Sequence, residues 1–300
     1  DLVVANPGVP RTSPFLKIAE HAGVPITTEI CLFVERCPAP IVGVTGTSGK
    51  TTTTSLIGAM MRRWDARTLV GGNIGGSLLD RVERITADTP VVLELSSFQL
   101  DRLGDLEWSP QIAVVTNFAP NHLDAHGSLE AYLGAKRKIV VYQGTEDRYV
   151  LNADDPVVSE WGEASDAMGS SFSLEKRLER GVYLSNGEIR HTLKGSEREI
   201  CPVSELQVLG RHNLANALAA ACAAVSRGIP EEDIFESIRS FRGVAHRLEK
   251  VAELNGVSYL NDSISTTQER ALVGLKAVSK PVILIAGGYD KGLVFDLLGR

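Results

Sequence analysis

Residues 41–54 read IVGVTGTSGKTTTT, and this stretch decides the fold that the rest of the sequence predicts. The apolar run IVGVTG is typical of a buried strand, and Gly46 and Gly49 allow the tight backbone turns that would follow it. A helix can then begin at Lys50 and continue to Arg63. Free backbone N–H groups and the positive end of the helix dipole would meet beside the Lys50 charge, so we interpret the loop as a phosphate cradle.

The loop departs from the full GxxxxGK[ST] pattern of nucleotide-binding loops. Val44 stands where that pattern has its first Gly, so only GxxGKTT remains. In the pattern, the hydroxyl groups of Thr51 and Thr52 would coordinate Mg²⁺ and hydrogen-bond phosphate. The alternative is a Gly-rich turn between a strand and a helix, with a solvent-exposed lysine. Because a strand and a helix are both predicted around the loop, we favour the nucleotide site.

Strand and helix patterns alternate along the chain, which predicts an α/β fold with a mostly parallel sheet. Ligands of such sheets lie beyond the carboxyl ends of the strands. Helices are predicted over residues 50–63 and 128–141, and an Ala-rich helix ends at Gly228 and Pro230. Residues 173–208 instead predict an antiparallel hairpin at the edge of the sheet. The predicted strands are DLVVAN (1–6), IVGVTG (41–46), PVVLELS (90–96), IAVVTNF (112–118), YVLNADD (149–155) and PVILIAGG (281–288).

Composition describes a globular chain of 300 residues, 43% hydrophobic and 23% charged. The 31 basic and 37 acidic residues give a net charge of −6, which offers no broad electrostatic surface for nucleic acid or an anionic membrane. The four cysteines form no CxxC pair, and no apolar run approaches the length of a membrane span. We therefore expect a cytoplasmic protein that binds neither nucleic acid nor membrane.

Acidic and imidazole side chains follow two of the predicted strands. Glu94 ends an apolar strand, where a buried carboxylate needs a cation, and a neighbouring strand would bring it to Mg²⁺ beside Thr51. The alternative is a Glu that emerges into solvent at the strand end. His122, Asp124 and His126 cluster after another strand end. Each alone could cap a helix or belong to the core, but together we interpret them as a site.

A short basic run lies in the helix predicted after Ser128. It comprises Lys136, Arg137 and Lys138. The ordinary interpretation of such a run is a solvated basic face of a helix.

Several segments together resemble the Mur ligase family, most closely those members that add D-glutamate to UDP-N-acetylmuramoyl-L-alanine. The resemblance covers nearly the whole chain, and the ordered set of matches is far more specific than any one of them. The matching segments are TGTSGKTT (45–52), ELSSFQL (94–100), NHLDAHGSLEAYLGAK (121–136), GRHNLANALAA (210–220), HRLE (246–249), NDS (261–263) and GGYDKG (287–292).

The resemblance implies an ATP-dependent, amide-forming ligase of peptidoglycan synthesis that works through an acyl phosphate. Its substrates would be ATP, D-glutamate and UDP-N-acetylmuramoyl-L-alanine, and we expect a monomer. It also implies three α/β domains. Residues 1–40 would be a remnant of a UDP-binding domain, residues 41–243 the complete P-loop ATPase domain, and residues 244–300 the start of an amino-acid-binding domain; the chain would lack its natural ends.

The resemblance further implies two Mg²⁺ ions, the first held by Glu94 and Thr51. The second would be held by His122 and a carbamylated Lys136, and Lys50 would complete the catalytic group. Arg137 and Lys138 would help to lower the pKa of the Lys136 amine. The implied ATP contacts are Gly46, Thr47, Ser48, Gly49, Lys50, Thr51, Thr52, Asn213, Asn216, Arg247 and Asp262, and the implied contacts of the other substrates are Asn73, Ser96, Thr266 and Lys291. For the two asparagines of the 210–220 segment, the alternative is ordinary helix N-capping.

Three residues depart from the family's motifs. Asn6 stands where the family has Ser, Asn121 where Asp commonly precedes the His, and Ile264 where Lys is expected. A sibling ligase that adds another amino acid, or one that glutamylates folate, is an alternative that ELSSFQL and NDS disfavour. A second alternative is a non-catalytic P-loop nucleotide-binding module, which Val44 and Ile264 would suit.

Overall fold

The computed structural model describes residues 1–121, 123–265, 268–289, 296 and 298. Three of the predicted site residues, His122, Thr266 and Lys291, lie outside this described part of the chain. The remaining predicted site residues all fall within it.

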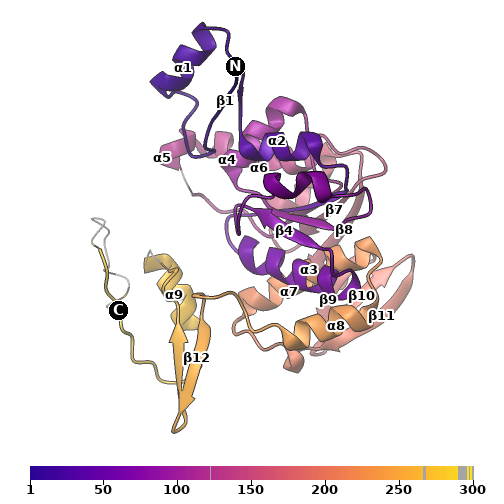
Figure 1. The fold of residues 1–300 in the computed structure, drawn as a ribbon. Helices are drawn as coiled ribbons and strands as arrows, with labels where there is room; N and C mark the ends of the chain where they lie inside the picture. Colours follow the sequence, from indigo (N-terminus) through magenta and orange to yellow (C-terminus); the bar gives the residue numbers. More distant parts are fainter. Residues whose placement is uncertain (122, 266–267, 290–295, 297, 299–300) are drawn as a thin grey trace.

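A nine-stranded sheet forms the centre of the fold (Figure 1). Along the chain its strands are β3 (Ile41–Thr45), β4 (Leu69–Gly72), β5 (Val91–Glu94), β6 (Ile112–Val115), β7 (Arg148–Asn152), β8 (Met168–Ser173), β9 (Gly181–Ser185), β10 (Glu188–Leu193) and β11 (Ser196–Pro202). Their order across the sheet is β11-β10-β9-β8-β7-β6-β3-β5-β4. All neighbouring pairs from β4 to β9 are parallel, whereas β10 pairs antiparallel with both β9 and β11. The predicted α/β fold with a mostly parallel sheet is confirmed.

Helices cover both faces of this sheet (Figure 1). The first face carries α3 (Lys50–Trp64), α7 (Arg211–Arg227) and α8 (Glu231–Ser240). The second face carries α2 (Glu29–Arg36), α4 (Ser97–Leu103) and α6 (Leu129–Val141), with the 3₁₀ helices η1 (Leu79–Arg84) and η3 (Val158–Ala164). Because both faces are covered, successive strand residues enter different cores: Val114 packs in the first and Val115 in the second.

Two smaller units flank the sheet in sequence. Before it, α1 (Pro14–His21) connects the short parallel strands β1 (Val3–Val4) and β2 (Ile26–Thr27). After it come the antiparallel strands β12 (Glu249–Leu254) and β13 (Val257–Asn261) and the helix α9 (Gln268–Lys276), which Figure 1 shows beside the main body. The remaining short elements are α5 (Leu123–His126), η2 (Gly104–Leu106) and η4 (Val203–Glu205).

Local sequence signals explain several element boundaries. The helix predicted from Lys50 is α3, and α6 begins after Ser128, whose hydroxyl accepts a hydrogen bond from Ala131 N at 3.1 Å. The hairpin expected within residues 173–208 is β9–β10, and its two turn residues have φ values of 52° and 80°. These positive values are those of the type I′ turn that an Asn-Gly pair favours.

The strand predicted for PVILIAGG is wrong. Residues 281–289 adopt neither strand nor helix, and Ile283 and Ile285 are 93% and 94% exposed. A parallel strand is stable only beside neighbours that satisfy its backbone groups and cover its side chains. Among the described residues, the nearest sheet in sequence is the β12–β13 hairpin, and this run does not pair with it.

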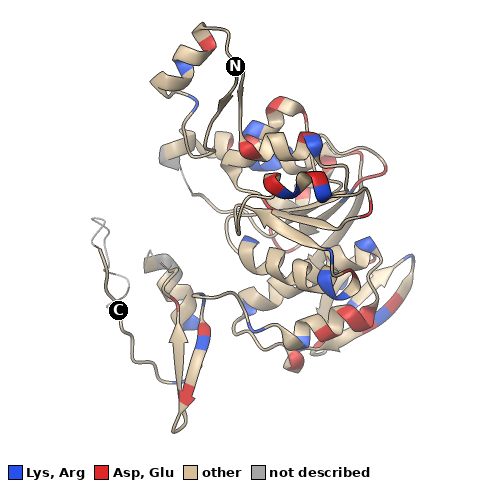
Figure 2. Cartoon of the chain, in the orientation of Figure 1, with Lys and Arg blue, Asp and Glu red and all other residues tan. Residues whose placement is uncertain are grey.

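Charged side chains are interspersed over the surface. Figure 2 shows basic and acidic residues spread over the elements of the chain, and the β10–β11 hairpin carries both kinds, in keeping with 31 basic and 37 acidic residues. No helix in the described ranges is both long and apolar enough to cross a membrane.

Candidate functional site

The loop between β3 and α3 has the tight geometry that its sequence predicts. Gly49 caps α3 with a φ of 83°, a left-handed conformation that glycine adopts without strain. A Cβ atom on Gly49 would lie 2.2 Å from Asn216 Oδ1, and one on Gly46 would lie 1.9 Å from Thr116 Oγ1. Both glycines are therefore required by close packing, the first against α7 and the second against the segment after β6.

The segment after β6 holds the loop through Asn117, which is not among the residues that the sequence predicts for the site. The Asn117 side chain accepts a hydrogen bond from Ser48 N at 2.9 Å and donates one to Ser48 O at 3.0 Å. Thr116 Oγ1 also donates to Ser48 O, at 2.6 Å. The polar tail of IAVVTNF, directly after a buried strand, is the sequence signal that could have identified this clamp.

Two lysines converge on one carbonyl of the loop. Lys50 Nζ donates to Gly46 O at 3.0 Å, and Lys136 Nζ donates to the same oxygen at 2.8 Å. Lys50 lies at the start of α3 and Lys136 lies in α6, so the β3–α3 loop joins helices from opposite faces of the sheet.

Lys136 is buried, with 2% exposure, and not part of a solvated helix face. Its Nζ lies 5.1 Å from the centre of the Tyr132 ring and 3.4 Å from Thr45 Oγ1. Burial, followed by repulsion from Lys50, lowers the pKa of Lys136 to about 6, although the carboxylate of Glu94 acts in the opposite direction. A large fraction of the amine is therefore neutral and nucleophilic at pH 7.

The expected cause of this pKa shift is wrong. We expected the neighbouring cations Arg137 and Lys138 to lower the pKa, but burial and Lys50 are the causes. Lys138 Nζ points to another partner, the Asp101 carboxylate, at 2.8 Å. Successive helix residues are turned by about 100°, so neighbours in sequence face different surroundings.

Glu94 lies at the carboxyl end of β5 and is 2% exposed, so the solvent-exposed alternative is wrong. Its Oε1 accepts a hydrogen bond from Asn73 Nδ2 at 2.8 Å, whereas its buried Oε2 has no hydrogen-bond partner among the described residues. An unsatisfied buried carboxylate oxygen is costly unless a cation meets it, so this donor fits Mg²⁺. The register pairs Glu94 with Val44, close to the start of the loop.

The hydroxyl residues that follow Lys50 differ in exposure. Thr51 is half-buried at the start of α3, and the Thr52 hydroxyl is fully buried without a hydrogen-bond partner among the described residues.

Thr47 Oγ1 donates to Ala119 O at 3.0 Å and lies 3.2 Å from Tyr132 OH. Thus Thr47 ties the loop to both the segment after β6 and α6.

His126 is the member of the predicted histidine and aspartate cluster whose side chain the structure describes. Its Nε2 lies 2.9 Å from Ser97 Oγ, and its ring stacks on Phe98 with centroids 4.8 Å apart. The centres of the His126 and Tyr132 rings lie 5.3 Å apart. Within the described part of the chain, no three His, Cys, Asp or Glu side chains gather closely enough to hold a metal by themselves.

The predicted asparagines of α7 do not cap the helix, because Gly210 occupies that position. Asn213 Nδ2 donates to Leu209 O at 2.7 Å, and Asn216 Nδ2 donates to Asn213 Oδ1 at 3.3 Å. Asn216 thus reaches Gly49 of the loop from a buried pair.

The other two predicted ATP contacts lie in the C-terminal unit. Asp262 accepts hydrogen bonds from Leu248 N at 3.0 Å and from Ser265 Oγ at 2.6 Å, which braces the β12–β13 hairpin. Burial and then the charge of Arg247 lower the pKa of His212, which lies at the start of α7.

A cavity of about 560 Å³ lies at the carboxyl end of β4, where Gly72 and Asn73 line it. Residues 4–8, the loop after β4 and the start of α4 form its walls, and Asn6, Asn73 and Ser96 line it. Ser96 also caps α4: its hydroxyl accepts a hydrogen bond from Gln99 N at 3.2 Å. The structure therefore brings both described residues of the predicted substrate set, Asn73 and Ser96, to one cavity.

Comparison with known proteins gives consistent matches. The family model described as the Mur ligase middle domain matches residues 44–224. A UDP-N-acetylmuramoylalanine–D-glutamate ligase from Roseiflexus sp. (strain RS-1) is 43% identical over 308 residues, and one from Pelotomaculum thermopropionicum is 44% identical over 300 residues. Both alignments cover all of this chain and 66% of the relative, so the chain spans slightly less than two thirds of their length.

Solved structures share the fold. The UDP-N-acetylmuramate-alanine ligase from Thermotoga maritima has a TM-score of 0.63 at 25% identity, covering 92% of this chain and 63% of that one. The UDP-N-acetylmuramoylalanyl-D-glutamyl-2,6-diaminopimelate–D-alanyl-D-alanyl ligase from Acinetobacter baumannii has a TM-score of 0.64 at 18% identity, covering 92% and 67%. Since the family model spans more than half of the residues, from β3 to α7, this chain belongs to the Mur ligase family.

Proposed function

We propose that this chain is part of an enzyme that joins D-glutamate to UDP-N-acetylmuramoyl-L-alanine at the expense of ATP, in peptidoglycan synthesis. The observation that carries the proposal is the convergence of Lys50, Glu94 and the buried Lys136 around one phosphate-type loop. The names of the similar relatives supply the substrates. In this proposal residues 1–40, 41–243 and 244–300 belong to the UDP-binding, ATP-binding and amino-acid-binding domains, and the enzyme acts as a monomer.

The loop would bind the phosphates of ATP. Its backbone N–H groups and the first turn of α3 would face them, and Lys50 would offset the charge that grows during phosphoryl transfer. Asn117 and Asn216 would hold the loop from two sides, which fixes the positions of its N–H groups. Arg247 and Asp262 would reach the nucleotide from the C-terminal unit, and Thr266 and Lys291 would attend D-glutamate.

We propose that two Mg²⁺ ions bind here. Glu94 and Thr51 would hold the first, and His122 and carbamylated Lys136 the second. One or two carboxylates together with substrate phosphates are the usual surroundings of Mg²⁺, so a closed cage of protein ligands is not needed. The ions would neutralise charge on the phosphoryl group and orient it.

Carbamylation of Lys136 needs the neutral form of its amine, and the surroundings of Lys136 favour that form. The amine nitrogen would attack CO₂, form an N–C bond and release one proton, which converts a cation into a carboxylate-like ligand. Burial beside Tyr132 and the nearby charge of Lys50 both favour the neutral form.

The cavity that Asn73 and Ser96 line would hold the sugar nucleotide. An oxygen of the L-alanyl carboxylate would attack the γ-phosphorus of ATP, with ADP as leaving group, to give an acyl phosphate. The amine of D-glutamate would then attack the acyl carbon, and inorganic phosphate and a proton would leave as the amide forms. Positioning and electrostatic stabilisation would supply most of the catalysis.

The test is the substrate dependence of ADP release by the full-length protein that contains this chain. We expect rapid release only when both UDP-N-acetylmuramoyl-L-alanine and D-glutamate are present, and a product with one new amide bond. Turnover with another amino acid in place of D-glutamate would make the protein a sibling ligase. ATP binding without turnover under any of these conditions would make it a non-catalytic nucleotide-binding module.

A further inference from the structure

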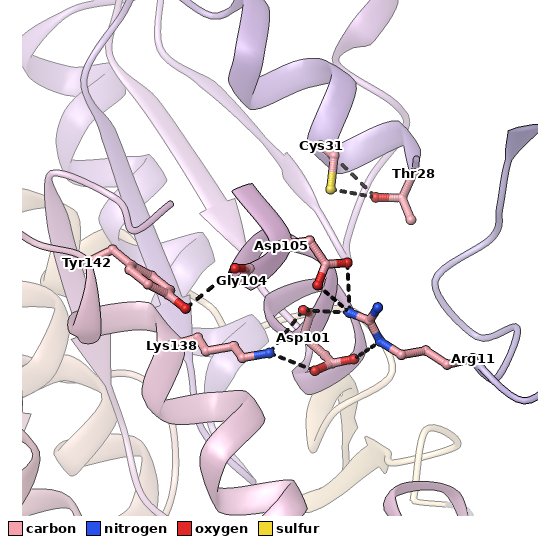
Figure 3. A network of polar contacts seen from close by, with 8 residues as sticks. All are labelled: Arg11, Thr28, Cys31, Asp101, Gly104, Asp105, Lys138 and Tyr142. Carbon is pink, nitrogen blue, oxygen red and sulfur yellow. Dashed lines mark hydrogen bonds and ion pairs between the residues drawn. The ribbon is translucent and has the colours of Figure 1, made fainter. Parts of the chain in front are cut away.

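Arg11 makes a fork of hydrogen bonds to the end of α4 and to η2 (Figure 3). Its Nε donates to Asp101 Oδ2 at 2.7 Å, and its Nη2 donates to the Asp101 carbonyl at 3.0 Å. The same Nη2 donates to both carboxylate oxygens of Asp105, at 3.0 and 2.9 Å. These partners lie 90 and 94 residues from Arg11 in sequence.

Asp101 also receives a second cation from a different element. Lys138 Nζ, from α6, donates to Asp101 Oδ1 at 2.8 Å and to its carbonyl at 3.2 Å (Figure 3). Burial alone would raise the pKa of Asp101, but the hydrogen bonds from Lys138 and Arg11 hold it below the ordinary value. A Cβ atom on Gly104 would lie 2.5 Å from Lys138 Cδ, so glycine leaves room for this side chain.

The fork is the polar link between the start of the chain and the main body. In the described structure, the other hydrogen bonds of residues 1–13 go to residues no later than Thr27, or to one another. Two turns, closed by Val9 N to Asn6 O at 2.9 Å and by Ser13 N to Pro10 O at 2.9 Å, connect Arg11 to the residues that line the cavity. The wall is thus held to the main body by two tethers, the pairing of β1 with β2, which leads directly into α2, and the Arg11 fork.

We propose that Arg11 is a positioning residue for the sugar-nucleotide substrate, because its fork to Asp101 and Asp105 sets the N-terminal wall of the cavity relative to the sheet. This inference rests on the proposed function for the identity of the ligand. The Arg11 and Asp101 side chains are 44% and 31% exposed, so simple ion-pair attraction between them is screened. The link instead fixes the orientation of the two segments through the geometry of the forked hydrogen bonds, which only a guanidinium can make.

The test compares Arg11→Ala with Lys17→Ala in the full-length protein. Lys17 is the matched control, because it is an exposed cation of the same N-terminal unit and its ion pair, to Glu20 at 2.8 Å, stays within α1. For Arg11→Ala we expect KM for UDP-N-acetylmuramoyl-L-alanine to rise about tenfold, with kcat and the KM for ATP changed less than about twofold. Arg11→Lys keeps the charge without the fork and should fall between the two. Lys17→Ala should match the wild type.

Two further measurements test the Arg11 link without requiring turnover. Amide hydrogen exchange of residues 3–13 should accelerate in Arg11→Ala and Asp101→Asn, but not in Lys17→Ala. Calorimetric binding of UDP-N-acetylmuramoyl-L-alanine should weaken in Arg11→Ala by the same factor as KM. If the wild type binds this compound without turnover, the proposed function fails. The comparison of binding affinities between Arg11→Ala and the wild type then still tests the positioning role. Equal affinities in Arg11→Ala and Lys17→Ala, or no binding by the wild type, would overturn the inference.

Discussion

Two lysines on α6, Lys136 and Lys138, differ by two positions in sequence and have opposite surroundings. Lys136 is buried over the Tyr132 ring, and its amine donates to a loop carbonyl. The Lys138 side chain is 27% exposed, and its amine bonds to the carboxylate of Asp101. The comparison shows how one basic run serves two purposes. Lys138, paired with a carboxylate, links two elements, whereas burial favours the neutral form of the Lys136 amine.

The largest expected effect is on catalysis. Lys136→Ala should lower ligase activity of the full-length protein on the order of a hundredfold or more, because the proposed function makes Lys136 a metal ligand. Short carboxylic acids should restore part of the activity by occupying the vacated ligand position. Arg137→Ala, on a different side of the helix, is the control and should be mild. Equally small effects of both substitutions would place Lys136 outside the catalytic group.

A second prediction concerns stability and pH, measured with EDTA in CO₂-free buffer so that neither metal nor carbamate contributes. The pKa of Lys136 is about 6 in the folded state and close to 10.5 when unfolded. Between these values the unfolded chain binds more protons, so the free energy of unfolding rises with pH. Lys136→Met removes this cost. We expect the variant to be more stable than the wild type by a few kcal/mol near pH 7, and the difference to shrink towards pH 10.

Thermal unfolding at several pH values, with Lys138→Met as the matched variant, checks that prediction. Lys138 keeps an ion pair, so its replacement should give no such advantage near neutral pH. A pH-independent difference between Lys136→Met and the wild type would mean that the amine remains charged in the folded protein.

Glu94→Gln should act on metal dependence more than on folding. The substitution keeps the size of the side chain but removes the charge that a Mg²⁺ ion needs. We expect the Mg²⁺ concentration for half-maximal activity to rise by about tenfold or more. A steep fall in melting temperature with an unchanged response to Mg²⁺ would make Glu94 a structural residue.

The smallest expected effect is on stability, and it concerns the pairing of Lys138 with Asp101. Two Gly→Ala substitutions test whether this pairing needs the space at Gly104. Gly134 lies in α6 with open space around its Cβ position, so Gly134→Ala should stabilise the protein by up to about 1 kcal/mol. Gly104→Ala should lack this gain, because its Cβ would displace Lys138 from Asp101. Denaturant unfolding of the two variants measures the difference. An equal gain in both would show that the Lys138 pair does not need the space at Gly104.

Local signals predicted most of the fold. The glycines of the loop, the helix start after Ser128 and the antiparallel hairpin β9–β10 depend on interactions over a few residues, and the structure has each where the sequence predicts it. The strand prediction for PVILIAGG was wrong because a β-branched run forms a strand only when neighbouring strands pair with it. That condition depends on the partner and not on the run itself.

The sequence indicated Lys50, Glu94 and Lys136 as candidates, but not the network of contacts that surrounds them. The Asn117 clamp joins positions 69 residues apart, so no spacing within either motif reveals it. The helix pattern of α6 did not distinguish Lys136 from its basic neighbours, because burial is decided by the loop and Tyr132 that pack against it. No sequence pattern indicated the contacts of Arg11, since its partners lie far along the chain.

The most direct test of the account is ¹³C NMR of the full-length protein in ¹³C-bicarbonate near pH 8, where amines and CO₂ coexist. We predict a protein-bound carbamate resonance in the wild type and in Arg137→Ala. The same resonance should be missing from Lys136→Met, in which the buried amine is replaced by a side chain of similar length. A wild-type spectrum without that resonance, or one that Lys136→Met leaves unchanged, would contradict the claim that Lys136 is the reactive buried amine of the site.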